Sequence, residues 1–215
     1  MGLYSEFETE LRSQFKDFGY KWTKSKELAC DWVLRRVPVG TGVDVGGTAY
    51  LVKKCQEMGC DVTYFDYFPP SDPAIQKHVV ADMASFGEHF APRSLDFITT
   101  RHTLEHSLNP LYQLWQYNRC LKDDGVMVVV VPHHSKNWVW FYSHFNCVPL
   151  ENWLMLFYRA GFRMQEINAG TWWSEDPDYI EYRLVLRVES RTLRLDNLPR
   201  EDCVETSVQP ADSSC

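Results

Sequence analysis

Long apolar runs are missing from this sequence, and so is a surplus of positive charge. No segment approaches the ~18 consecutive apolar residues of a membrane-spanning helix, and residues 1–6 are acidic where a signal peptide is basic and then apolar. The 22 Lys and Arg are outnumbered by 29 Asp and Glu, which gives a net charge of −7. We therefore expect a cytoplasmic protein that engages no membrane, and the composition argues against nucleic acid as a partner.

Cysteine pairs with metal-binding spacing are also lacking. The seven cysteines are odd in number and contain no C-x-x-C pair, which favours reduced thiols over disulfides or a zinc site. Cys55 and Cys120 fall on expected helices, where we expect them to be small core residues. The 215 residues, 45% of them hydrophobic, are enough for one domain with a sizeable core.

From residue 41 onward, apolar strands alternate with amphipathic helices. The expected strands are residues 43–45, 62–65, 79–81, 95–99, 126–131, 162–168 and 179–188, and the expected helices are residues 49–58, 110–121 and 149–160. Such alternation predicts an α/β fold with a Rossmann-like, doubly wound, mostly parallel sheet. The last two strands have no helix between them, so they predict a C-terminal antiparallel hairpin.

The two ends of the chain differ from this middle part. Ser5 and Glu8 form a capping-box pattern before helically spaced apolar residues, and a second helix is expected at residues 26–36. We expect residues 1–39 to form a helical N-terminal cap on a single domain of residues 1–190. The polar residues 191–215 are expected to be a disordered tail.

The segment with the most chemical information is the turn after the first strand. Asp44 and Val45 are followed by Gly46 and Gly47, and Asp66 ends the next strand 66 − 46 = 20 residues later. Glycines allow a sharp turn close to a ligand, and an acid after the second strand can accept both ribose hydroxyls. The pattern predicts a nucleoside site, although a tight turn alone, with Asp66 as a turn acid, would explain the same residues.

Several further segments resemble, in order, the class I S-adenosylmethionine-dependent methyltransferases, and in particular the type 11 methyltransferase domain. The matching segments are residues 44–47, Asp66, residues 81–83, residues 101–110 with their H-x-L-E-H pattern, residues 120–125 with Pro132, and the Ala-Gly-Phe at 160–162. The chain departs from the pattern at Thr48 and Tyr50, where the family has glycines; Thr48 can also cap the following helix.

The resemblance implies S-adenosylmethionine as the cofactor and a set of residues that bind it. That set is Asp44, Gly46, Gly47, Asp66, Tyr67, Asp82, Met83, Arg101 and His102. For Asp82 the alternative is a helix N-cap, and for Arg101 and His102 it is a solvated loop.

Three histidines are candidates for a catalytic base: His133 and His134, which follow the fifth strand, and His144. They could instead bind zinc, but no acid or cysteine has suggestive spacing, so we expect no metal. His106 is expected to anchor its loop rather than to act as a base.

Aromatic clusters at residues 138–142 and 172–173 either pack as a lid over the core or line an apolar or sugar-stacking acceptor pocket. They predict a small-molecule or glycan-type acceptor, methylated on a hydroxyl oxygen. Two other functions stay open: a non-catalytic scaffold, and a nicotinamide-dependent oxidoreductase. The second requires a G-x-G-x-x-G turn, which the chain lacks, and a parallel last strand.

Overall fold

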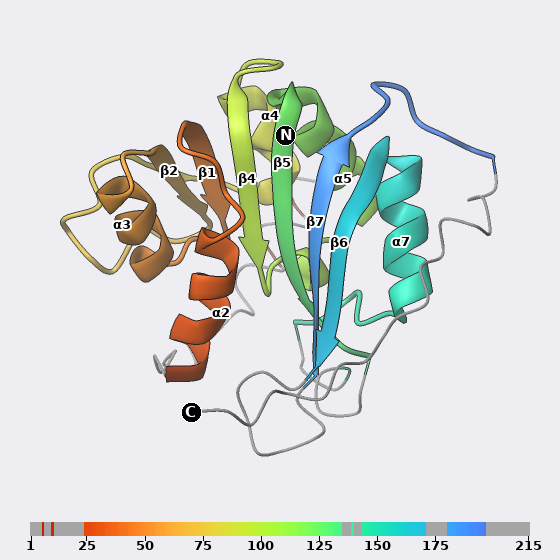
Figure 1. Cartoon of the computed structure of the whole chain (residues 1–215), viewed down its shortest axis with the longest axis horizontal. Helices are drawn as coiled ribbons and strands as arrows, with labels where there is room; N and C mark the ends of the chain where they lie inside the picture. The colour runs from red at the N-terminus through yellow and green to blue at the C-terminus, as the bar shows by residue number, and fades with distance from the viewer. Residues whose placement is uncertain are drawn as a thin grey trace.

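A computed structural model describes residues 24–134, 143–170 and 180–196, together with residues 6, 10 and 139. Its seven strands form one sheet in the order β3-β2-β1-β4-β5-β7-β6 (Figure 1). The strands are β1 (Thr41–Val45), β2 (Asp61–Asp66), β3 (His78–Val80), β4 (Leu95–Arg101), β5 (Leu121–Pro132), β6 (Phe162–Gly170) and β7 (Glu181–Val188).

Strand direction divides the sheet into two parts. Strands β3, β2, β1, β4 and β5 are parallel, whereas β7 is antiparallel to both β5 and β6. The predicted Rossmann-like sheet with a C-terminal antiparallel hairpin is therefore confirmed. The strand order reverses between β1 and β4, and in such sheets ligands bind outside the carboxyl ends of the strands at that point.

Helices cover both faces of the sheet (Figure 1). Side chains of β5 alternate between two cores: Met127, Val129 and Val131 pack with α4, α5 and α7, while Val126, Val128 and Val130 pack with α2 and α3. A strand that is apolar on both faces is typical of the centre of a parallel sheet. The helices are α2 (Lys24–Leu34), α3 (Ala49–Glu57), α4 (Phe86–His89), α5 (Pro110–Cys120) and α7 (Leu150–Arg159), with short 3-10 turns η1 (Met83–Ser85) and η2 (Leu104–His106).

The start of β5 differs from the prediction. The Asp-Asp-Gly at 123–125 lies between the expected helix at 110–121 and the expected strand at 126–131, but β5 already begins at Leu121. Leu95 of β4 pairs with Leu121 and Phe97 pairs with Val126, so β5 advances five residues where β4 advances two. The polar residues form a bulge inside the strand, because ladder pairing resumes on both sides of it.

The segments at the ends are only partly described. The first predicted helix apart from residues 6 and 10, both aromatic clusters apart from residue 139, and residues 197–215 lie outside the described residues. Residues 191–196, which the sequence places in the tail, make contacts: Arg191 donates to the backbone of Asn118, and Tyr158 donates to Asp196 at 2.9 Å. Within the described part of the chain, no helix is long and apolar enough to cross a membrane.

The cysteines are partly described. Five of them, Cys30, Cys55, Cys60, Cys120 and Cys147, are described and all are free thiols. Cys55 and Cys120 are 1% and 2% exposed and belong to the two cores, as predicted.

Candidate functional site

The turn between β1 and α3 requires both of its glycines. Gly46 has φ +73°, and its N–H donates to the carbonyl of Phe65 at 2.9 Å. A Cβ at Gly46 would lie 1.9 Å from Oγ1 of Thr103, and one at Gly47 would lie 2.2 Å from the ring of Tyr64. A side chain at either position would therefore collide with the protein itself, so the tight turn left open as an alternative accounts for both glycines.

Asp44 holds this turn in place. Its side chain is 1% exposed; Oδ2 accepts from the N–H of Thr48 at 2.7 Å and Oδ1 accepts from the hydroxyl of Thr99 at 2.7 Å. Burial raises the pKa of Asp44 to about 6, although both hydrogen bonds oppose the rise. Thr48 occupies the N-cap position of α3, but its side chain makes no capping hydrogen bond, so the backbone amide is satisfied by Asp44 instead.

Asp66 ends β2 beside this turn. Its Oδ1 accepts from the N–H of Phe68 at 3.0 Å, which is the turn-acid role. Burial raises the pKa of Asp66 to about 6, while the N–H of Phe68 and the charge of His106 lower it. A carboxylate that uses one oxygen locally still has acceptor capacity for a diol. Tyr67, the next residue, is half-buried.

The turn after β3 lies against the end of β2. The N–H of Ala81 donates to the carbonyl of Asp66 at 3.0 Å. Asp82 is the N-cap of η1, and its Oδ1 accepts from the N–H of Ala84 at 2.6 Å, so the cap alternative is confirmed. Met83 is 9% exposed and belongs to the core. The two predicted acids thus lie at neighbouring strand ends.

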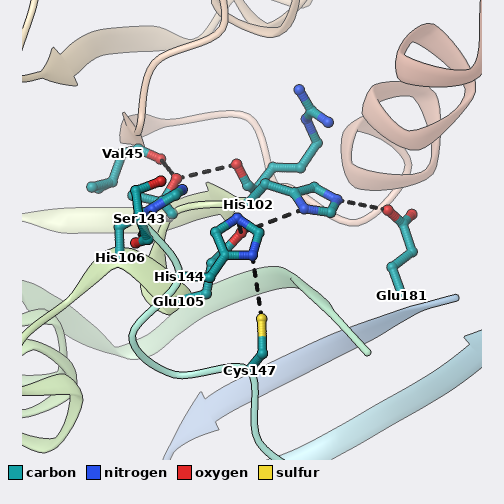
Figure 2. A network of polar contacts seen from close by, with 10 residues as sticks. Val45, His102, Glu105, His106, Ser143, His144, Cys147 and Glu181 are labelled. Carbon is teal, nitrogen blue, oxygen red and sulfur yellow. Dashed lines mark hydrogen bonds and ion pairs between the residues drawn. The ribbon is translucent and has the colours of Figure 1, made fainter. Parts of the chain in front are cut away.

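His102 follows Arg101, the last residue of β4, and adopts φ +50°. Its Nε2 lies 2.9 Å from Oε2 of Glu181 and its Nδ1 lies 3.4 Å from Oε1 of Glu105; both acids are fully buried (Figure 2). Burial alone would lower the pKa of His102, but the two carboxylates raise it above its usual value. Both ring nitrogens therefore face acids, which makes His102 the centre of a buried ion network.

Sequence reasoning missed the other half of this network. Arg183 Nε donates to Oε1 of Glu181 at 2.7 Å inside the protein. Burial would raise the pKa of Glu181, but His102 and Arg183 hold it at about 2. An acid and an arginine two residues apart on an apolar strand share one face, and this spacing was a signal that could have found the pair.

A second cluster joins the loop after β4 to the segment before α7 (Figure 2). His144 Nε2 lies 3.9 Å from Oε1 of Glu105, and His144 Nδ1 lies 3.3 Å from Sγ of Cys147. His106 Nδ1 donates to the carbonyl of Ser143 at 2.7 Å. This hydrogen bond is the loop-anchoring contact expected for His106. The acid and thiol next to His144 were not apparent from sequence spacing.

The remaining base candidates form a separate pair at the end of β5. The rings of His133 and His134 are 4.1 Å apart, and His134 Nδ1 lies 3.2 Å from the hydroxyl of Tyr182. Nδ1 of His133 is buried and has no hydrogen-bond partner among the described residues. Burial, and then the neighbouring His134, lower the pKa of His133. The three predicted histidines therefore belong to two sites rather than one.

Comparison with known families shows which family the chain belongs to. A family model described as a methyltransferase domain matches residues 21–167. The chain belongs to this methyltransferase domain family. The resemblance to methyltransferases predicted from the sequence is therefore confirmed, and the antiparallel β7 is opposite to the parallel last strand that an oxidoreductase would need. Comparison with curated proteins finds no match.

Solved structures share the fold of this methyltransferase domain at low sequence identity. The Burkholderia thailandensis 1,6-didemethyltoxoflavin-N1-methyltransferase, solved with S-adenosylhomocysteine, superimposes with a TM-score of 0.70 at 14% identity, over 88% of this chain and 92% of its own. An S-adenosylmethionine-dependent methyltransferase from Archaeoglobus fulgidus gives 0.61 at 16% identity, over 86% and 100%. The [4+2]-cyclase SpnF gives 0.63 at 14% identity, over 81% and 85%. Such identities establish the fold alone.

Proposed function

We propose that this methyltransferase domain binds S-adenosylmethionine at the carboxyl ends of β1, β2 and β4 and transfers its methyl group to a hydroxyl oxygen. The observation that carries the proposal is the meeting of the Gly46 turn, clasped by Asp44, with Asp66 at the switch point of the sheet. The N–H groups at the start of α3 and the acceptor capacity of Asp66 suit the two ends of a nucleoside ligand.

The sulfonium of the cofactor is a good leaving group, so the protein mainly supplies alignment and a base. Geometry favours His133 for the second role, because burial and the neighbouring His134 lower the pKa of its imidazole, which favours the neutral form, and Nδ1 has no partner among the described residues. His133 would take the proton of the acceptor hydroxyl as its oxygen attacks the methyl carbon. The acceptor class that we propose is a small molecule or a glycan-type metabolite.

The departures from the family pattern at Thr48 and Tyr50 are the best support for the non-catalytic alternative. The hydroxyl of Tyr50 donates to Oδ1 of Asp31 in α2 at 3.1 Å, and Thr48 is 8% exposed. Tyr50 thus ties α3 to α2, and Thr48 is packed in the protein. The Tyr50 side chain therefore has a structural partner and the Thr48 side chain is buried, which weakens the argument that the departures abolish the site.

Calorimetric titration with S-adenosylmethionine, S-adenosylhomocysteine and NAD separates the three functions. The proposal predicts that the first two bind with one-to-one stoichiometry and that NAD produces no heat of binding. Binding of NAD alone would identify an oxidoreductase. Binding of none of the three by folded protein would support the non-catalytic alternative.

A further inference from the structure

The cluster of Glu105, His106 and His144 has the composition of a metal site. One ligand atom from each of these residues lies within 4.8 Å of the other two. Two imidazoles with one carboxylate is a ligand set that proteins use for zinc and for other divalent transition metals. The loop after β4 and the segment at 143–147 supply the three residues, so the cluster depends on tertiary contact rather than on a sequence motif.

Hydrogen bonds outside the cluster orient its ring nitrogens. A carbonyl only accepts, so the 2.7 Å contact with Ser143 fixes the proton of neutral His106 on Nδ1 and leaves the Nε2 lone pair available. His144 Nδ1 is engaged by Cys147 at 3.3 Å, and its Nε2 faces Glu105. Metal-binding histidines usually use the second ring nitrogen in this way.

Glu105 is the second indication of a ligand. Its side chain is 0% exposed, and neither carboxylate oxygen makes a hydrogen bond with the described residues. Its ion contacts include His102 at 3.4 Å, which belongs to the ion network described above, and His144 at 3.9 Å. A buried carboxylate with spare acceptor capacity is costly unless charges or a metal compensate for it.

Hydrogen bonds to backbone carbonyls connect the loop after β4 to the segment at 143–147. The carbonyl of Glu105 accepts from the N–H groups of Phe145 at 2.8 Å and Asn146 at 3.0 Å, and the Asn146 side chain donates to the carbonyl of Ser107. The chain segments that carry the three side chains are therefore fixed to each other. The ligand atoms lie up to 4.8 Å apart, and binding of tetrahedral zinc would bring them to roughly 3.3 Å from one another.

We propose that Glu105, His106 and His144 bind one divalent transition-metal ion of the zinc type, through a carboxylate oxygen and the two Nε2 atoms. Three protein ligands leave a fourth position that water or an acceptor oxygen can take, as in catalytic zinc sites. The proposal concerns metal binding by the chain itself, so it stands or falls separately from methyl transfer.

The test is a titration of the full chain, freed of metal by a chelator, with Zn²⁺ in competition with a chromophoric chelator. We expect one equivalent to bind, and we expect His106→Gln and His144→Gln each to weaken binding by at least about 10-fold, the loss seen even for outer-shell partners. His78→Gln is the matched control, because His78 is exposed on the edge strand β3. Circular dichroism of the metal-free variants establishes that each is folded.

Two further measurements cover the other outcomes. Zn²⁺ should raise the melting temperature of the parent but not of His144→Gln, since a ligand stabilises only the state that binds it. Cys147→Ser should keep the stoichiometry, and the Co²⁺ form should lack a thiolate charge-transfer band. No binding to the parent, or equal binding to all variants, would overturn the proposal; loss of binding in Cys147→Ser alone would replace the ligand set.

Discussion

Removal of the His102 imidazole should destabilise the protein in a defined pH range. His102→Asn replaces a cation held between Glu105 and Glu181 by a neutral amide, and Asn tolerates the φ of +50° at this position. Breaking a buried ion pair by removing one partner costs about 3–5 kcal/mol. Because the Asn amide can keep one hydrogen bond, we expect a loss of about 3 kcal/mol in the free energy of unfolding.

The pH dependence follows from the directions of the pKa shifts. The pKa of His102 is raised in the folded state, so its contribution is complete below the unfolded value of about 6.5 and declines as pH rises through the folded value. Glu181 is held at about 2, so its contribution is complete above about 4.5. The difference between parent and variant should therefore be largest between about pH 4.5 and 6.5 and smaller at pH 8.5.

Urea unfolding of both proteins at pH 5.5 and pH 8.5 measures this difference. His78→Asn serves as the control, since a substitution at an exposed position changes stability by about 0.5 kcal/mol or less. A difference below about 1 kcal/mol between parent and His102→Asn at pH 5.5, or one that grows toward pH 8.5, would refute the ion network as a source of stability.

Three other predictions concern the proposed site. Gly46→Val should lower the melting temperature and abolish S-adenosylmethionine binding, because a Cβ there collides with a neighbouring loop and φ is +73°; normal melting would contradict the steric argument. Burial raises the pKa of Asp66 to about 6, so cofactor affinity should fall as pH drops below about 6 and binding near pH 6 should release protons, which calorimetry in two buffers detects; an affinity independent of pH would exclude its carboxylate. Replacement of the responsible base among His133, His134 and His144 by Asn should lower turnover roughly 10² to 10⁴-fold and remove the acidic limb of the rate profile; parent-like rates in all three variants would leave positioning as the better account.

The sheet was predictable because its central strands are short and apolar on both faces. Val126 to Val131 has no other plausible environment than the middle of a parallel sheet, and the missing helix between the last two strands identified the hairpin. Strand ends were less predictable: β4 extends to Arg101 and β5 begins at Leu121. Pairing with a neighbouring strand determines where each strand begins and ends, and local sequence propensity does not reveal that pairing.

The site was predictable where its residues follow strand ends, and not where loops meet. Asp44 and Asp66 are recognisable because Asp44 is the penultimate residue of an apolar strand and Asp66 is the last residue of another, each just before a turn. The partners Glu105 and Cys147 of His144 are 39 positions before it and three after it, and only the hydrogen bonds between the two loops bring the distant one close. Separation in sequence carries no information about such contacts.

The most direct test of the central claim is the affinity of Asp66→Asn for S-adenosylmethionine, measured by calorimetry at pH 7.5 beside Asp61→Asn. Asp61 is at the opposite end of the same strand and is exposed. Loss of one charge-assisted hydrogen bond, worth about 1.5–3 kcal/mol, predicts that Asp66→Asn binds at least tenfold more weakly than the parent. The control Asp61→Asn should bind with the affinity of the parent. Equal affinities in both folded variants would contradict a ribose site at the end of β2.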